Sequence, residues 1–256
     1  YYDGGVFTFR GDNFRRNAAF GTVEVTAERL SVLWQAELGS LRTADNGTLY
    51  GVGWTGQPAI VKWTSEVRQM MNLYEEKKNT KALREVIFGA QDGKIYFLDL
   101  TDGTATRDPI SVGYPLKGSV SVDTYGRPLI AVGQGISKLA NGKTGSIGLH
   151  VYNLVSGKKA FLINGRKSDN QKQYTTNGAF DGTALFLYEN DALVAAGENG
   201  LLYTVDLGSK FTYPNAENPD AQGALELKQS TTYLRTKGAG EKDALVSKES
   251  SVAMYD

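Results

Sequence analysis

The hydrophobic and polar positions of this chain follow a plan that occurs three times. Residues 86–100 form an apolar stretch, a turn at Asp92-Gly93 and a second apolar stretch that ends in Leu-Asp-Leu. Residues 193–207 repeat the plan with Asn199-Gly200 in the turn. Short apolar runs bounded by such residues are typical of strands, and the Asp-Gly and Asn-Gly pairs favour tight hairpins. Each copy therefore predicts an antiparallel hairpin.

The third copy lies between the other two. Residues 129–133 supply its first strand and residues 149–154 its second. One polar residue ends the second strand of each copy, and the spacings between these residues are 54 and 53; they are Asp99, Asn153 and Asp206. Internal repeats near this length predict a repeat architecture in which each copy is one structural unit.

Each unit also opens with a short alternating stretch, which predicts about four strands per unit. The opening stretches are residues 119–123, 177–181 and 250–254. A more divergent unit is expected earlier, with apolar stretches at residues 32–34, 49–53 and 59–63. The chain is therefore predicted to be all-β, with about four units plus the opening strand of a fifth.

Two segments depart from the repeat. In the first, Ser65 is placed as an N-cap, and four apolar side chains follow at helical spacing: Val67, Met70, Met71 and Tyr74. Lys77 and Lys78 then suit the C-terminal end of a helix. We predict one inserted helix over residues 66–78, with its apolar face packed on the chain's own sheets in preference to a partner. The second segment, residues 208–247, is predicted as a long irregular connection with one strand near residues 225–234.

Composition and charge narrow the functional classes. The 256 residues include 30 Gly and 14 Tyr but only 6 Pro, which suits many tight turns between aromatic-rich strands. Lys and Arg total 28 and Asp and Glu total 28, so the charge balance predicts no capture of nucleic acid or of an anionic membrane. No apolar run is long enough to span a membrane. The sequence has no cysteine, which excludes disulfides and thiolate chemistry within it.

The repeat unit resembles that of the quinoprotein-like (pyrroloquinoline-quinone-like) β-propellers. The shared pattern is a strand, Gly-x-x-Asp-Gly, and a strand that ends in Leu-Asp-x-x-Thr/Ser-x-Gly. The opening of the chain, residues 9–17 followed by Leu33-Trp34-Gln35, is similar to the entry into the first blade of that family. The chain departs from the family at residues 157–160, where Gly-Lys is not followed by the expected tryptophan.

The resemblance implies one β-propeller domain over residues 1–256, built from four-stranded antiparallel blades. Such propellers usually have about seven or eight blades, so about four blades and a strand imply an incomplete part of a ring. A protein partner, the remaining part of the same propeller or a self-associated copy is then expected to cover the terminal blades, and the first two are preferred. The resemblance also implies an extracellular or cell-envelope location, because related bacterial propellers act there as scaffolds.

Enzymes of this family are expected to hold the quinone against vicinal cysteines and to coordinate calcium beside a catalytic Asp. A chain without cysteine therefore implies no cofactor. The three polar residues that end the strands, Asp99, Asn153 and Asp206, are instead predicted to cap free backbone N–H groups before a turn. None of the acidic turns has the spacing of a twelve-residue calcium loop, so no metal site is predicted.

His150 is the only histidine and occupies the repeat position of Tyr96 and Tyr203. A catalytic triad or a histidine-ligated metal would depend on this residue alone. The equivalent positions hold tyrosine, which cannot take over that chemistry. We therefore expect His150 to be a packed strand residue with one satisfied ring nitrogen, and no catalytic residue is assigned.

These observations predict a non-enzymatic propeller that serves as a scaffold for protein partners. The candidate partner-binding residues are Met70, Met71 and Tyr74 on the helix and the aromatic residues Trp54 and Tyr125. The alternative is a carbohydrate- or cell-wall-binding propeller that uses exposed aromatics such as Trp54 and Tyr125. A quinone-dependent dehydrogenase is the third hypothesis.

Overall fold

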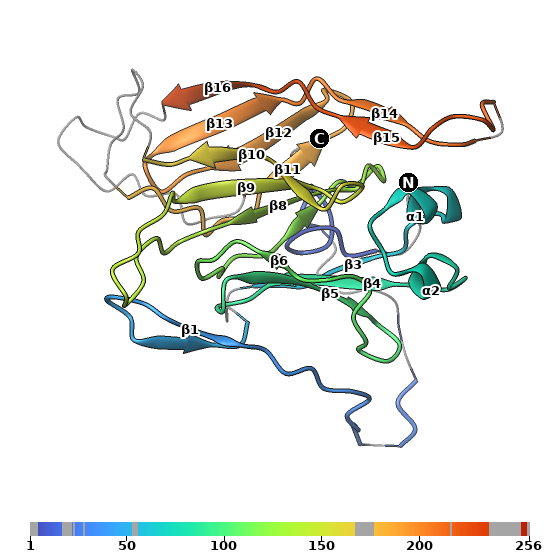
Figure 1. Ribbon diagram of the computed structural model, residues 1–256, viewed down its shortest axis with the longest axis horizontal. Coiled ribbons are helices and arrows are strands. Elements are labelled where there is room, and N and C mark those ends of the chain that lie inside the picture. Colours follow the sequence, from blue (N-terminus) through green and yellow to red (C-terminus); the bar gives the residue numbers. More distant parts are fainter. Residues whose placement is uncertain are drawn as a thin grey trace.

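The computed structural model describes residues 5–16, 22, 24–27, 29–52, 56–166, 177–215, 217–235 and 252–254. Three four-stranded antiparallel sheets form the body of this part of the chain, stacked one above another in Figure 1. The predicted class, mostly β with four-stranded antiparallel sheets, is therefore confirmed.

In all three sheets the strands lie side by side in chain order, although in the third sheet two other strands come between the last two in the sequence. The first sheet contains β3 (Ala59–Val61), β4 (Glu85–Gly89), β5 (Lys94–Asp99) and β6 (Ile110–Ser111). The second contains β7 (Ser121–Val122), β8 (Leu129–Gly133), β9 (Gly148–Asn153) and β10 (Lys158–Asn164). The third contains β11 (Leu185–Leu187), β12 (Ala192–Ala196), β13 (Leu201–Asp206) and β16 (Ser230–Arg235).

Two further hairpins lie outside these sheets. One joins β1 (Ser40–Arg42) to β2 (Thr48–Tyr50). The other joins β14 (Lys210–Thr212) to β15 (Ala224–Glu226) and is inserted between the last two strands of the third sheet. The predicted single strand near residues 225–234 is therefore wrong: β15 and β16 pair with different strands.

The two Gly-containing turns are confirmed as hairpin tips. Gly93 lies between β4 and β5 with φ +82°, and Gly200 lies between β12 and β13 with φ +83°. A side chain at either position would be strained in this left-handed conformation, which explains the glycine.

The earliest predicted unit does not form a sheet of its own. Its last stretch is β3, which pairs with β4 through Ala59↔Ile87 and so provides the first strand of the next sheet. Its first stretch, residues 32–34, is extended but forms no strand. In the third unit, residues 177–181 also form no strand, and β11 provides the first strand instead. Of residues 250–254, only 252–254 are described, and they form no strand.

The predicted helix over residues 66–78 is wrong in its continuity. Two short helices occur instead, α1 (Ser65–Met70) and α2 (Glu75–Lys78), and Thr64 rather than Ser65 is the N-cap of α1. The chain is extended between them because its backbone bonds to neighbouring segments. The Asn72 N–H donates to the Leu154 carbonyl and the Tyr74 N–H donates to the Thr106 carbonyl.

Apolar side chains join the sheets face to face. The first core lies between the first and second sheets and includes Ile87 and Phe97 from one and Ile130 and Val132 from the other. The second core lies between the second and third sheets and includes, among others, Ala131, Val151, Leu193 and Tyr203. Alternation along each strand therefore sends side chains into both neighbouring cores.

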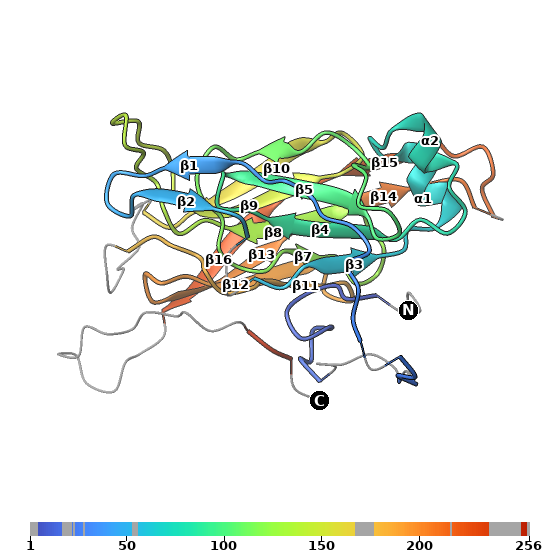
Figure 2. The same cartoon turned by 90° about the horizontal axis from the view of Figure 1, so that it is seen from below.

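An N-terminal arm, residues 5–16, ties the first strands of all three sheets together. Val6 pairs with Ile60 of β3, and the Phe7 carbonyl accepts from the Val122 N–H of β7. Further along the arm, the Asn13 side chain donates to the Phe186 carbonyl of β11 at 2.6 Å. Figure 2 shows this arm at the side of the stack where β3, β7 and β11 lie.

A buried ion pair joins the first sheet, the helical insertion and the second sheet. The Glu85 carboxylate accepts from Arg107 Nε (3.1 Å) and Nη2 (2.9 Å), and from Trp63 Nε1 (2.8 Å). Arg107 also donates to Asn72 Oδ1 at 2.6 Å and to the Leu154 carbonyl at 3.4 Å. Glu85 and Arg107 are 0% and 1% exposed.

Replacing Arg107 should therefore destabilise the fold strongly. Arg107→Ala leaves the Glu85 carboxylate buried without its counter-charge, and we expect a loss of about 3–5 kcal/mol in the free energy of unfolding. Arg84→Ala is the matched control, because Arg84 is an exposed arginine beside Glu85 and should change stability by about 0.5 kcal/mol or less. Urea unfolding followed by tryptophan fluorescence measures both. Equal stability of the two variants would contradict this account of the ion pair.

Candidate functional site

The three sheets use equivalent residues on the face that is directed toward the preceding sheet, here called the lower face. On the second sheet, Ile130 lies opposite Tyr152 and Val132 opposite His150. On the third sheet, Leu193 lies opposite Val205 and Ala195 opposite Tyr203. All eight side chains are buried, because the preceding sheet or its connections pack on them.

The lower face of the first sheet carries Val86 opposite Leu98 and Phe88 opposite Tyr96. The rings of Phe88 and Tyr96 stack with centroids 5.6 Å apart. No sheet of the described chain packs on this face, and both rings are only half-buried. This face is therefore apolar, like its two counterparts, but lacks the sheet that covers them.

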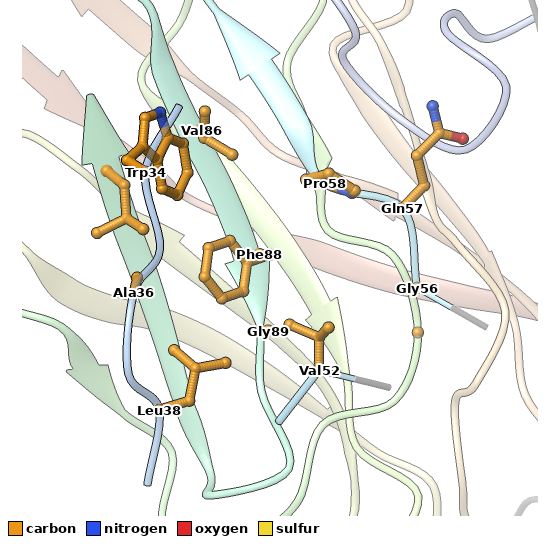
Figure 3. Close-up of a pocket in the computed structure, with 12 residues that line it drawn as sticks. Trp34, Ala36, Leu38, Val52, Gly56, Gln57, Pro58, Val86, Phe88 and Gly89 are labelled. Carbon is orange, nitrogen blue, oxygen red and sulfur yellow. The ribbon is translucent and has the colours of Figure 1, made fainter. Parts of the chain in front are cut away.

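An extended strap, residues 34–38, crosses this face instead (Figure 3). Trp34 anchors one end, where its Nε1 donates to the Leu100 carbonyl at 2.9 Å. Its ring lies so close to Gly103 that a Cβ there would stand 2.6 Å from it. At the other end, the Gly39 N–H donates to Asp92 Oδ2 at 3.2 Å.

The strap leaves an apolar pocket of about 290 Å³ on the sheet. Phe88 and Val86 form its floor, Trp34 and Leu38 one wall, and Val52 and Pro58 the opposite wall, as Figure 3 shows. Gln57 supplies a polar side chain at the edge, and its Oε1 accepts from the Arg10 N–H. The lining offers apolar contact and no acid, base or nucleophile, so the pocket suits aliphatic or aromatic side chains.

The predicted partner-binding residues of the helix are packed on the chain itself. Met71 is 1% exposed and belongs to the first core. Met70 is half-buried and lies against Gly223, so close that a Cβ there would stand 2.7 Å from it. The Tyr74 hydroxyl donates to Asp108 at 2.6 Å, a bond that raises the pKa of the phenol.

The predicted aromatic residues fall in two different places. Trp54 lies outside the described residues. Tyr125 is 39% exposed and stacks on Tyr188, which is 48% exposed, with ring centroids 4.3 Å apart. Arg127 lies over the Tyr188 ring at 5.3 Å. Tyr125 therefore belongs to an exposed aromatic pair from the turns of two neighbouring sheets.

The three polar residues at the strand ends are backbone caps, as predicted. Asp99 Oδ1 accepts from the N–H of Thr101 at 3.0 Å. Asn153 and Asp206 make the same bond two residues ahead, at 2.9 and 3.0 Å. The repeat of one turn geometry explains why a short polar side chain stands at each position.

His150 is a packed strand residue with one bonded nitrogen, also as predicted. Its Nε2 lies 2.7 Å from Gln134 Oε1, and the side chain is buried against Tyr152. Burial, with a smaller effect of Lys159, lowers the pKa of the imidazole to about 4. His150 therefore stays neutral near pH 7.

No group of three His, Cys, Asp or Glu side chains in the part of the chain that the structure describes is placed to hold a metal ion. None of its helices has the length and apolar character needed to cross a membrane. Comparison with protein-family models and with curated proteins gives no match.

The pocket was missed from the sequence, although a signal was present. Apolar residues occupy both alternating sets of β4 and β5, which indicates a sheet that is covered on both faces. The sequence does not say which segment covers each face. The strap's role is a tertiary property, since Trp34 donates to the carbonyl of Leu100, which follows β5 and lies 66 positions away.

Acid should destabilise the fold partly through His150. The pKa of its imidazole is about 4 in the folded chain and about 6.5 when unfolded, so this contribution to stability is complete above pH 6.5 and is lost as the pH falls toward 4. We expect a loss of about 2–3 kcal/mol from this residue between pH 7.5 and 4.5. Urea unfolding at both pH values should show a smaller loss for His150→Tyr, which carries the residue of the equivalent positions. Equal losses would contradict the assignment.

Proposed function

We propose that this chain is a non-catalytic scaffold whose sheets are blades of a quinoprotein-like β-propeller and whose first sheet binds other protein chains through its lower face. The observation that carries this proposal is a difference in burial between residues at corresponding positions on the lower faces of the three sheets. Val86, Phe88, Tyr96 and Leu98 correspond to residues that a preceding sheet buries on the second and third sheets. On the first sheet Val86 and Leu98 are 6% exposed beside the strap, whereas Phe88 and Tyr96 are only half-buried. Apolar surface of this kind, with a pocket at its centre, is typical of protein-binding surfaces.

The propeller assignment is supported by the strand order. Three successive four-stranded meanders stack face to face, and the first strands of all three contact the N-terminal arm. In a propeller, blades of this order radiate from a common inner edge. The repeat resemblance adds the proposal of an extracellular or cell-envelope location and of a larger ring to which this chain contributes.

The non-catalytic assignment is supported by how the chemically capable residues are used. Asp99 and Asp206, the acids that would be considered for quinone chemistry, bind backbone N–H groups. The one histidine is buried in β9 and bonded to Gln134. The pocket itself is lined by apolar side chains. These residues and the pocket lining support a role in binding rather than in catalysis.

Selection of peptides on the purified chain tests the proposal. Phage-displayed random peptides that bind the chain should carry bulky apolar residues and should bind Phe88→Lys at least tenfold more weakly, because the lysine places a charge on the pocket floor. Tyr188→Ala is the control, since it removes an exposed aromatic residue away from the pocket. Thermal unfolding checks that both variants remain folded.

Two results of this selection would contradict the proposal. If no peptide is selected, or if the selected peptides bind Phe88→Lys as well as the original chain, the lower face of the first sheet is not a protein-binding surface. Peptides that lose binding only with Tyr188→Ala would transfer the function to the Tyr125–Tyr188 pair.

The exposed Tyr125–Tyr188 pair favours a second candidate function, carbohydrate binding. Aromatic faces that remain in water can stack on sugar rings, and both rings of this pair are substantially exposed. A glycan array probed with the chain and with Tyr125→Ala tests it. Binding that is lost in Tyr125→Ala but retained in Phe88→Lys would support this function, and an array without signal would contradict it.

A further inference from the structure

The third sheet presents a free face that complements the lower face of the first. Its upper face, directed away from the second sheet, carries Val194, Ala196, Leu202 and Thr204. The first three are half-buried and Thr204 is exposed. No sheet of the described chain packs on them. The described stack therefore ends in a lower face that only the strap covers in part and an upper face on which no sheet packs.

Both junctions inside the stack join an upper face to a lower face. At the first junction, Ile87, Ile95 and Phe97 of the first sheet share a core with Ile130, Val132 and Tyr152 of the second. At the second junction, Ala131, Leu149 and Val151 share a core with Leu193, Ala195 and Tyr203. The register places Val194, Leu202 and Thr204 at the positions of Ile87, Ile95 and Phe97.

We propose that a second copy of this chain docks the upper face of its own third sheet against the part of the first sheet's lower face that the strap leaves open, around Phe88 and Tyr96. This inference rests on the proposed function, since it names the partner of the same surface. The chain itself carries the only upper face that the described residues leave uncovered, so a second copy supplies a face of the required kind.

The sizes of the side chains fit this pairing. The lower face of the first sheet is dominated by two large rings, Phe88 and Tyr96. The upper face of the third sheet offers smaller residues, Val194, Ala196 and Thr204, beside Leu202. Small residues facing large ones is also the arrangement at the second junction, where Ala131 and Tyr203 meet in one core. Such alternation lets two faces interdigitate at the density of a protein interior.

The segment before the strap also lacks cover in the single chain. Leu30, Val32 and Leu33 are 100%, 71% and 86% exposed, and Trp34 follows them directly into the pocket wall. Large apolar side chains grouped in this way are unfavourable in water and mark interaction surfaces. A copy docked on the first sheet would lie beside the segment and shield it.

The proposed contact joins two different surfaces, so it is a heterologous interface. Contacts of this kind close into rings when the rotation permits and otherwise extend into filaments. Two copies can use both of their free faces at once only if the two stacks curve toward each other. The mass of the assembly therefore distinguishes a closed ring from a filament as well as showing that the contact forms.

Sedimentation velocity of the whole chain tests the proposal through complementary variants. The original chain should associate as its concentration rises. Phe88→Lys blocks the lower face and Leu202→Lys blocks the upper face, so each variant alone should remain at the monomer mass of 27.8 kDa. An equimolar mixture retains one intact pair of faces and should form a species of twice that mass and no larger one. Tyr188→Lys, on neither face, should associate like the original chain.

Several outcomes would overturn the proposal. The first is an original chain that stays monomeric at concentrations up to about 1 mM, which corresponds to negligible affinity. Association that Phe88→Lys abolishes and Leu202→Lys leaves intact would indicate two first sheets facing each other instead. A mixture that remains monomeric would exclude the heterologous contact. In each case peptide binding that depends on Phe88 would still support the proposed function, so the two failures are distinguishable.

Discussion

The buried Glu85 carboxylate is the constraint on which much of the structure depends. A charge at 0% exposure is tolerated only where counter-charge and hydrogen bonds surround it, and Glu85 receives both from Arg107 and further bonds from Trp63 and Thr106. Because Arg107 also bonds the loop after α1 and the end of β9, one carboxylate fixes three parts of the chain relative to each other. Apolar cores supply non-directional attraction, and this ion pair adds specific bonds among the three parts.

A comparable device occurs at the next junction. Arg127, 2% exposed, bonds to Asp123 on the second sheet and to Asp191 and Ser209 on the third. Hydrophobic attraction is non-directional, so the core contributes close packing at this junction and the ion pair contributes a directional contact. A buried arginine between carboxylates on adjacent sheets has one favourable position. Ion pairs thus give each junction the direction that its core cannot provide.

The repeat of the sheets explains why the apolar faces without a neighbouring sheet lie at the two ends of the stack. Each sheet is apolar on both faces, and a repeat of such sheets satisfies every face except the two outermost. The strap covers the first of these only in part, because five extended residues cannot replace a four-stranded sheet. The proposed binding at this face would therefore follow from the repeat itself and would need no added catalytic or charged group.

The features that could be predicted from the sequence alone are those that depend on local interactions or on the repeat. The Asp-Gly and Asn-Gly hairpins, the caps at Asp99, Asn153 and Asp206, and the packed His150 depend on residues close in sequence or on the repeat, and they were predicted correctly. Only the tertiary structure decided the partner of β3, the break between α1 and α2, and the pocket under the strap. In each case a backbone or side chain bonds to a segment far along the chain, and those bonds override the local pattern.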